Sequence, residues 1–165
     1  MNKNLEIKLK LENASHINSV RNSLKQYSRS VEKQIDVYYK IKKGRLKLRI
    51  INDKEGSLIL YNRAENKGKR ISHYIISKTK DFRELDFILS RQFEILVKVI
   101  KKREIFVSKN VRIHLDKISG LGNFLEIEII YSKLINAKKQ MTELITHLDL
   151  DEKKFIKNSY SDMLK

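Results

Sequence analysis

Residues 111–129 read VRIHLDKISGLGNFLEIEI, and this stretch determines the fold class. In each half, apolar and polar residues alternate with a period of two, which is typical of β-strands. The halves meet at SGLG, residues 119–122, where Gly120 and Gly122 favour a tight turn. The stretch therefore predicts two antiparallel strands, over 110–118 and 123–131.

The same alternation recurs along the chain and predicts six further strands. They cover residues 4–12, 31–39, 45–51, 57–63, 70–77 and 95–107, with a turn-like segment at 64–69. Helical spacing of apolar residues predicts helices over 14–27, 81–93 and 134–148, then a short helix at 151–156 and a tail at 157–165. Because consecutive strands read as hairpins, we expect an α+β domain spanning 1–165. Its eight antiparallel strands close into a barrel, with helices packed outside.

Composition limits the classes of protein. A length of 165 residues suits one domain, and the absence of Cys excludes disulfides and thiolate zinc sites. The first residues contain no uninterrupted apolar stretch and no run has the length of a membrane helix, so we expect a cytoplasmic protein. The net charge of +16 favours a polyanionic partner, although a Lys-rich surface also accounts for the total.

The polar faces of the predicted strands are segregated by sign. Arg45, Lys47 and Arg49 form one cationic row, and Lys101 with Arg103 forms another. An ordinary half-buried sheet would turn its charged face to water. Segregation favours the alternative in which these faces line a tunnel and the helices cover the apolar faces outside. Cations at i and i+2 lie about 6.5–7 Å apart, a spacing that suits a chain of phosphates.

An acidic row accompanies the cationic ones. Glu126 and Glu128 lie on one face of their strand, and two carboxylates at i and i+2 can jointly hold Mg²⁺ or Mn²⁺. His114 lies in phase with Arg112 and Asp116. Its imidazole can be read as a proton shuttle or as a hydrogen-bonded residue of the wall.

These motifs together resemble the CYTH superfamily, which includes class IV adenylate cyclases, thiamine triphosphatases and other triphosphate tunnel metalloenzymes. Residues 4–8, NLEIK, are similar to the family signature Glu-x-Glu-x-Lys. Residues 34–50 resemble the family's aromatic and basic strand pair, and 61–74 resembles its Tyr/Arg strand followed by Ser-x-Tyr. Residues 111–129 combine an Arg/Asp strand, a Gly-Leu-Gly turn and Glu-x-Glu, and 158–164 fits the family's tail.

The resemblance implies a tunnel that binds a triphosphate with Mg²⁺ or Mn²⁺. The implied metal ligands are Glu6, Glu126, Glu128 and Asp116, and Glu6 and Glu126 are also the candidate catalytic groups. The implied phosphate cradle is Lys8, Arg45, Lys47, Arg49, Arg63, Lys101, Arg103 and Arg112. Tyr61 and Tyr160 are expected to line the tunnel or to pack at its mouth. Candidate partners are ATP, another nucleoside triphosphate, tripolyphosphate or thiamine triphosphate, and a homodimer is left open.

Two departures from the family pattern keep several functions open. Asn4 replaces the first acidic residue of the signature, and Ile75 stands where many members carry an acidic residue. Hydrolysis and cyclisation of a triphosphate both suit the cradle, and a binding module without turnover suits the reduced carboxylate set. An RNA-binding domain would place aromatic residues on an exposed sheet face, a pattern that is not found here, so nucleic acid is not expected as partner. Without a long apolar run, a membrane is not expected either.

Overall fold

The computed structural model describes residues 2–66 and 69–165, and among these the side chains of all but 2 and 63–66. The strands are β1 (Asn2–Leu11), β2 (Ser28–Tyr39), β3 (Arg45–Ile51), β4 (Glu55–Asn66), β5 (Lys69–Thr79), β6 (Ile95–Ser108), β7 (Val111–Ile118) and β8 (Gly122–Ile130). They close into a barrel in the order β1-β5-β4-β3-β2-β6-β7-β8. The prediction of a closed antiparallel barrel of eight strands is therefore confirmed.

The barrel consists of two β-meanders, which pair with each other through β2 and β6, and of β1, which closes the ring. Strands β2 to β5 pair in sequence, as do β6 to β8, and the long pairing of β2 with β6 joins the two groups. Strand β1 closes the ring by pairing with β5 on one side and β8 on the other. In the β7–β8 turn, Gly120 and Gly122 have φ of 81° and 97°, which confirms the turn predicted there. The centre of the predicted turn at 64–69, residues 67–68, lies outside the described residues.

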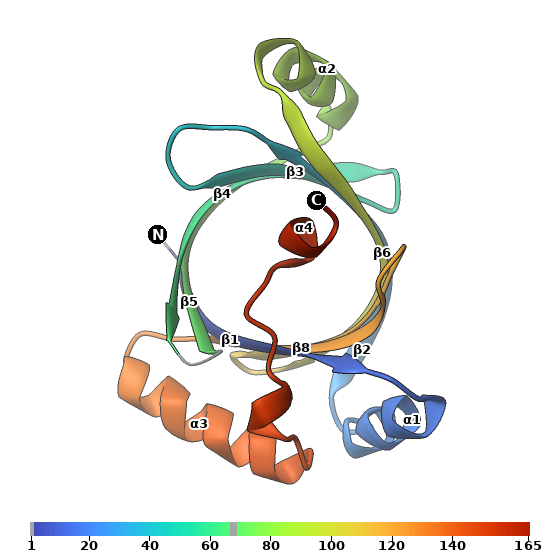
Figure 1. Ribbon diagram of the computed structural model, residues 1–165, viewed down its shortest axis with the longest axis vertical. Helices are drawn as coiled ribbons and strands as arrows, with labels where there is room; N and C mark the ends of the chain where they lie inside the picture. Colours follow the sequence, from blue (N-terminus) through green and yellow to red (C-terminus); the bar gives the residue numbers. More distant parts are fainter. Residues whose placement is uncertain (1, 67–68) are drawn as a thin grey trace.

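Three helices predicted from the sequence lie outside the barrel. They are α1 (Ala14–Ser23), α2 (Phe82–Gln92) and α3 (Leu134–His147), and Figure 1 shows all three around the ring of strands. Helix α1 ends four residues earlier than the predicted 14–27. No helix of the described part of the chain is long and apolar enough to cross a membrane.

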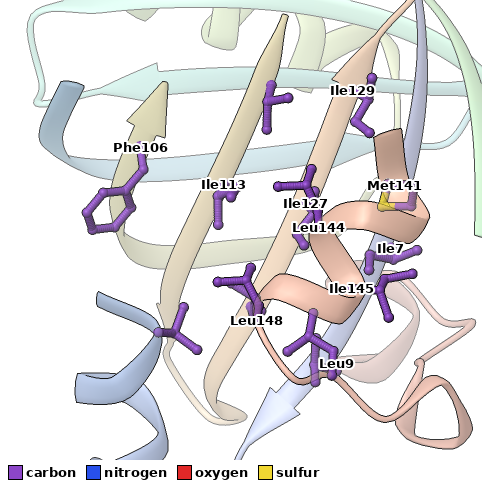
Figure 2. Packing of buried hydrophobic residues seen from close by; sticks show 14 of the residues in the cluster. Ile7, Leu9, Phe106, Ile113, Ile127, Ile129, Met141, Leu144, Ile145 and Leu148 are labelled. Carbon is purple, nitrogen blue, oxygen red and sulfur yellow. The ribbon is translucent and has the colours of Figure 1, made fainter. Parts of the chain in front are cut away.

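The helices cover part of the apolar outer face of the barrel, over β1, β7 and β8 and over β2 and β3. Met141 and Ile145 of α3 pack on Ile7 of β1 and Ile127 of β8, as Figure 2 shows. Met141 and Ile127 are both 0% exposed. Helix α2 contributes Leu89 to a second cluster, over β2 and β3. Because the apolar side of these strands points outward, their polar side faces the lumen.

The end of the chain returns to the barrel. After a short 3₁₀ helix, η1 (Glu152–Lys154), the amide of Ile156 donates to the carbonyl of Lys8 on β1. The last helix, α4 (Tyr160–Met163), begins at a capping box of Ser159 and Asp162. Figure 1 shows α4 within the ring of strands, where Tyr160 is 5% exposed. The predicted tail thus fills part of the lumen.

Candidate functional site

Acidic and basic side chains of the lumen are paired across neighbouring strands. Directly opposed pairs of opposite charge include Glu6 with Arg70, Lys8 with Glu126, Asp36 with Arg49, Arg103 with Asp116 and Arg112 with Glu128. Opposite charges in register attract across a sheet, so each row of one sign is balanced by its neighbours. The rows on β3, β6 and β8 each carry one sign, as predicted, whereas β1 carries Glu6 beside Lys8 and β7 carries Arg112 with Asp116.

One group of cations surrounds Asp36 of β2. Its Oδ2 accepts from Nζ of Lys47 at 3.0 Å and from Nζ of Lys101 at 2.9 Å. Its two oxygens also accept from Nε and Nη2 of Arg49 at 2.7 and 2.9 Å. Three predicted cradle residues therefore converge on one carboxylate, which leaves this cluster with an excess of positive charge.

The surroundings shift the pKa values in the cation cluster. Burial alone would raise the pKa of Asp36, but the three cations, Arg49 first, hold it well below the ordinary value. Burial lowers the pKa of Lys101 to about 7, and the charge of Arg103 adds to this effect although Asp36 opposes it. Lys101 is therefore a cradle residue whose charge changes near neutral pH.

A group of possible metal ligands lies on β7 and β8. Ligand atoms of His114, Glu126 and Glu128 all lie within 4.8 Å of one another. Nδ1 of His114 is 3.6 Å from Oε1 of Glu126 and 4.0 Å from Oε1 of Glu128. Burial would raise the pKa of Glu126, but the charge of Lys8, the contact with His114 and the charge of Arg103 hold it well below the ordinary value. Glu126 is thus ionised and available to a cation.

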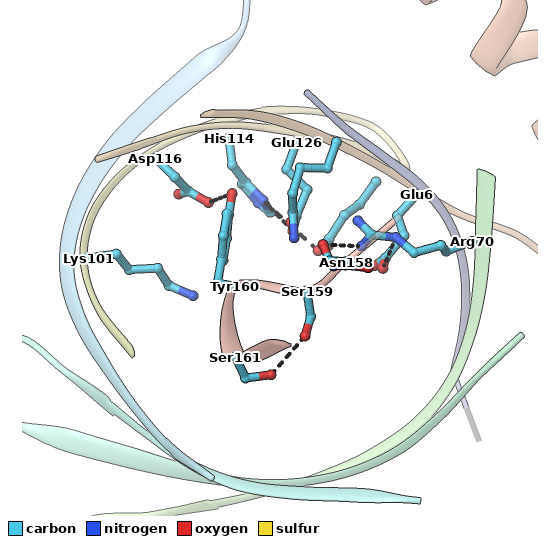
Figure 3. Close-up of polar contacts among 12 residues, drawn as sticks. Glu6, Arg70, Lys101, His114, Asp116, Glu126, Asn158, Ser159, Tyr160 and Ser161 are labelled. Carbon is cyan, nitrogen blue, oxygen red and sulfur yellow. Dashed lines mark hydrogen bonds and ion pairs between the residues drawn. The ribbon is translucent and has the colours of Figure 1, made fainter. Parts of the chain in front are cut away.

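Two other predicted metal ligands, Glu6 and Asp116, are paired with arginines. Oε1 of Glu6 lies 3.1 Å from Nε of Arg70, which is 0% exposed. Asp116 receives two bonds of 2.6 Å from Arg103, and the hydroxyl of Tyr160 donates to Asp116 at 2.9 Å. Figure 3 shows the Glu6–Arg70 and Tyr160–Asp116 contacts on either side of His114 and Glu126. Glu126 and Glu128 are therefore brought together, whereas Glu6 and Asp116 are paired with arginines.

The remaining predicted cradle residues have different surroundings. Nζ of Lys8 lies 3.5 Å from Oε2 of Glu126 and 3.7 Å from the ring centroid of Tyr160. Arg45 donates to Ser159 at 2.8 Å and to Asp162 at 2.9 Å, so the C-terminal segment engages it. Arg112 is more exposed than the others, and the side chain of Arg63 lies outside the described residues.

A cavity of about 110 Å³ lies between the two kinds of charge. Its walls include the cations Lys47, Arg49 and Arg112, the carboxylates Glu6 and Glu128, and the polar residues Asn4, Ser72 and Tyr74. Tyr61 also lines it, in agreement with the expectation for that residue. The wall of this cavity therefore carries both cations that can contact an anionic group and carboxylates that can contact a metal ion.

Two interior charges, Asp36 and Arg70, were not among the predicted site residues. Asp36 lies in phase with Gln34 and Tyr38, and the register with Arg49 marks it as inward-facing. Arg70 opens the segment RISHYIIS in phase with Ser72, and both are buried. The period of two could have indicated both positions, but Lys101 and Glu6, which contact Asp36 and Arg70, lie on strands far away in the sequence.

The lumen has features that suit a bound divalent cation. Glu6 and Glu128 lie directly opposite each other on β1 and β8, so their like charges favour a cation in addition to Arg70 beside Glu6 and Arg112 opposite Glu128. Among the described side chains, Oδ1 of Asn4 and Nδ1 of His114 are buried without a hydrogen-bond partner. Carboxylate and amide oxygens are the ligands that hard divalent ions prefer. The residues present therefore fit a metal ion.

A closed antiparallel barrel with paired charges inside defines a class of tunnel-like β-proteins. The family model of the CYTH domain matches residues 2–160, and the chain belongs to this family. The comparison with curated proteins gave no match.

Solved structures similar to this chain include three that it matches almost end to end. The PH1012 protein from Pyrococcus horikoshii OT3 has a TM-score of 0.87 at 20% identity, with 100% of both chains covered. A putative adenylate cyclase from Vibrio parahaemolyticus has a TM-score of 0.79 at 19% identity, covering 97% of this chain and 96% of that one. The putative adenylyl cyclase HpAC1 from Hippeastrum, described as having a dominant triphosphatase activity, has a TM-score of 0.71 at 15% identity over 99% and 94%. At these identities the likeness is one of fold.

Proposed function

We propose that this protein binds a triphosphate inside the barrel together with a divalent metal ion, Mg²⁺ or Mn²⁺, and hydrolyses a phosphoanhydride bond. One observation carries the proposal: the same cavity is bordered by Lys47 and Arg49 of β3 and by Glu6 and Glu128 of β1 and β8. A phosphate chain needs cations along its oxygens, and a metal ion bound to it needs carboxylates. Membership of the CYTH family supports this assignment.

The cations hold the substrate in the proposed mode of binding. Arg49 has a planar guanidinium that can bond two phosphate oxygens, and Lys47 and Lys101 add compact charges beside it. All three are in contact with Asp36, so a phosphate enters a cluster whose positive charge exceeds that of its counter-ion. Arg112, which lines the same cavity, provides a further charge.

The carboxylates hold the metal ion and position water. Glu126 and Glu128 are the proposed ligands, and a divalent ion bound there supplies neutralisation of the charge on the phosphate oxygens. Glu6 and Glu126 are the proposed groups that orient the attacking water. The water oxygen forms a bond to the terminal phosphorus, the bond from that phosphorus to its bridging oxygen breaks, and the shortened phosphate chain leaves. The proton released from water passes to solvent.

The substrate we propose is a nucleoside or inorganic triphosphate. The triphosphatase activity described for the Hippeastrum relative favours hydrolysis over cyclisation. The Vibrio relative is a putative adenylate cyclase, so the formation of a cyclic nucleotide with release of pyrophosphate is the second reaction to be assayed.

A panel of metals and triphosphates tests the proposal. Release of phosphate or pyrophosphate is measured from ATP, GTP, tripolyphosphate and thiamine triphosphate, each with Mg²⁺ or Mn²⁺. We expect activity for the wild type and a loss of at least about 100-fold for Glu126→Gln/Glu128→Gln, because charge-neutral ligands hold the metal poorly. The matched control is Glu12→Gln/Glu143→Gln, which removes two exposed carboxylates. Equal activity in both double variants would refute the metal site, and tight binding without turnover on the whole panel would leave a binding module.

A further inference from the structure

We propose that His114 is a nitrogen ligand of this metal ion, and that the site therefore prefers a first-row transition metal such as Mn²⁺ or Co²⁺ to Mg²⁺. The inference rests on the proposed function, in which Glu126 and Glu128 hold the metal. The inference adds His114 to the two proposed carboxylate ligands, and it specifies that the preferred ion is a transition metal.

The position of His114 follows from the strand register. His114 of β7 lies directly opposite Glu126 of β8, so both side chains point into the lumen from adjacent strands. Figure 3 shows the imidazole directed toward Glu126. The distances of 3.6 and 4.0 Å from Nδ1 to the two carboxylates are too long for hydrogen bonds. Ligands bound at about 2.1 Å around one octahedral ion lie roughly 3.0–4.2 Å apart, so the observed separations suit a shared ion.

Nδ1 of His114 makes no hydrogen bond with the described residues, although Glu126 and Glu128 lie near it. His114 is 3% exposed. Leaving a buried polar atom unpaired costs about 1–3 kcal/mol, whereas a metal ion would use the lone pair directly. An imidazole that binds a metal ion through Nδ1 carries its ring hydrogen on Nε2.

Neighbouring cations do not prevent this arrangement. Nη2 of Arg103 approaches Oε1 of Glu126 at 3.4 Å, but its bonds to Asp116 are 2.6 Å long. Nζ of Lys8 is near the other oxygen, Oε2 of Glu126, at 3.5 Å. Glu126 can therefore turn Oε1 toward an ion while both cations keep a carboxylate partner.

The ligand set determines the preferred ion. Mg²⁺ takes oxygen ligands and keeps several waters, whereas imidazole suits transition metals. Asn4 carries no charge where the family signature has an acid, so the oxygen set is weaker for a hard ion. A site of two carboxylates and one imidazole therefore favours binding of transition-metal ions, which bind nitrogen well, over Mg²⁺.

Pulsed electron paramagnetic resonance of bound Mn²⁺ tests the inference without any turnover. The chain contains four His residues, and the variant His16→Gln/His73→Gln/His147→Gln keeps His114 as its single His. We expect nitrogen coupling to Mn²⁺ in the wild type and in this triple variant. Bound Mn²⁺ with oxygen ligands only would overturn the role of His114 while leaving the proposed function intact. Failure of Mn²⁺ to bind, with and without tripolyphosphate, would remove the metal from both proposals.

Metal affinities measured by calorimetry give a second, independent readout. For His114→Gln we expect the affinity for Mn²⁺ and Co²⁺ to fall by at least about tenfold, with loss of the nitrogen coupling, while the affinity for Mg²⁺ changes much less. His147→Gln, at an exposed position on α3, is the matched control. An equal fall for all three ions would contradict the preference. If His114→Gln does not fold, the triple variant decides the question.

Discussion

Nζ of Lys101 lies 2.9 Å from Oδ2 of Asp36, and both side chains are at most 2% exposed. Lys101 belongs to β6 and Asp36 to β2, so the pairing of these long strands creates the contact. Asp36 binds two further cations of the proposed cradle, Lys47 and Arg49. A carboxylate of the protein thus occupies the centre of the cluster that we assign to phosphate, and it keeps the cations in place when no phosphate is bound.

Replacement of Asp36 by Asn should make the fold depend on an added anion. Three buried cations lose their counter-ion, and breaking a buried pair in this way costs about 3–5 kcal/mol. We expect a lower free energy of unfolding in urea, and a larger stabilisation by tripolyphosphate than the wild type shows. Asp53→Asn is the control, because the Asp53 side chain is 79% exposed and paired with an exposed Arg83. Equal stabilisation of all three proteins by tripolyphosphate would contradict this role.

Binding of tripolyphosphate should take up a proton at Lys101. The pKa of this residue is about 7, and bound phosphate favours its charged form. Above pH 7, affinity should therefore fall as pH rises, and calorimetry in buffers of different ionisation enthalpy should detect the proton. Tripolyphosphate also exchanges protons when it binds, and the difference in proton uptake between the wild type and the Lys101 variant separates the proton of Lys101 from these. Lys101→Arg should lose the uptake, and Lys102→Arg, at an exposed neighbouring position, should retain it.

The same titration affects folding with the opposite trend. The pKa of Lys101 falls from an ordinary 10.5 to about 7 on folding, so the unfolded chain binds more protons between these values. The contribution of Lys101 to the free energy of unfolding should therefore rise with pH from about 7 to 10.5. Urea titrations of the wild type and Lys101→Met across this range measure the contribution, and an identical pH dependence for both would count against it.

Removal of the Tyr160 hydroxyl should weaken the attachment of the C-terminal segment. The hydroxyl donates to the ionised Asp116 at 2.9 Å. Burial, together with the charges of Asp116 and Glu126, raises the pKa of Tyr160 well above the ordinary value, so the donor keeps its proton. Tyr160→Phe should cost about 1.5–3 kcal/mol in urea denaturation. Tyr131→Phe, half-buried on the outside of the barrel, should cost less; equal losses would argue against the hydrogen bond.

Truncation of Met141 should show how much α3 contributes by covering the barrel. Its side chain is 0% exposed against the outer apolar face of the strands. Met141→Ala should lower the free energy of unfolding by about 2–5 kcal/mol. Ile135→Ala on the same helix, at a position 72% exposed, should change it by less than about 0.5 kcal/mol. Thermal or urea denaturation compares the two, and similar losses would mean that α3 does not depend on this contact.

Much of the fold could be predicted because strand alternation is a local signal. The strands β3 and β7 were predicted with nearly the observed bounds, and the apolar spacing of α3 also agrees with the structure. The ends of β2 and β4 extend beyond the prediction, since pairing with a long partner strand continues past the alternating core. For the site, the inward placement of Glu126 and Glu128 was predicted, whereas the pairing of Glu6 with Arg70 was not.

The sequence by itself determined which side chains share a face, because successive residues of a strand point to opposite sides whatever the strand pairs with. It thereby placed the charged rows of residues 45–49 and 126–128 on the face opposite their apolar neighbours. Only the tertiary structure decided which charges meet. Asp36 and Lys101 are separated by 65 residues, and a slip of one residue in the β2–β6 register would turn one of them outward. No local sequence pattern specifies the register in which the barrel closes. That register makes Asp36 the counter-ion of Lys47, Arg49 and Lys101, and it places His114 beside Glu126.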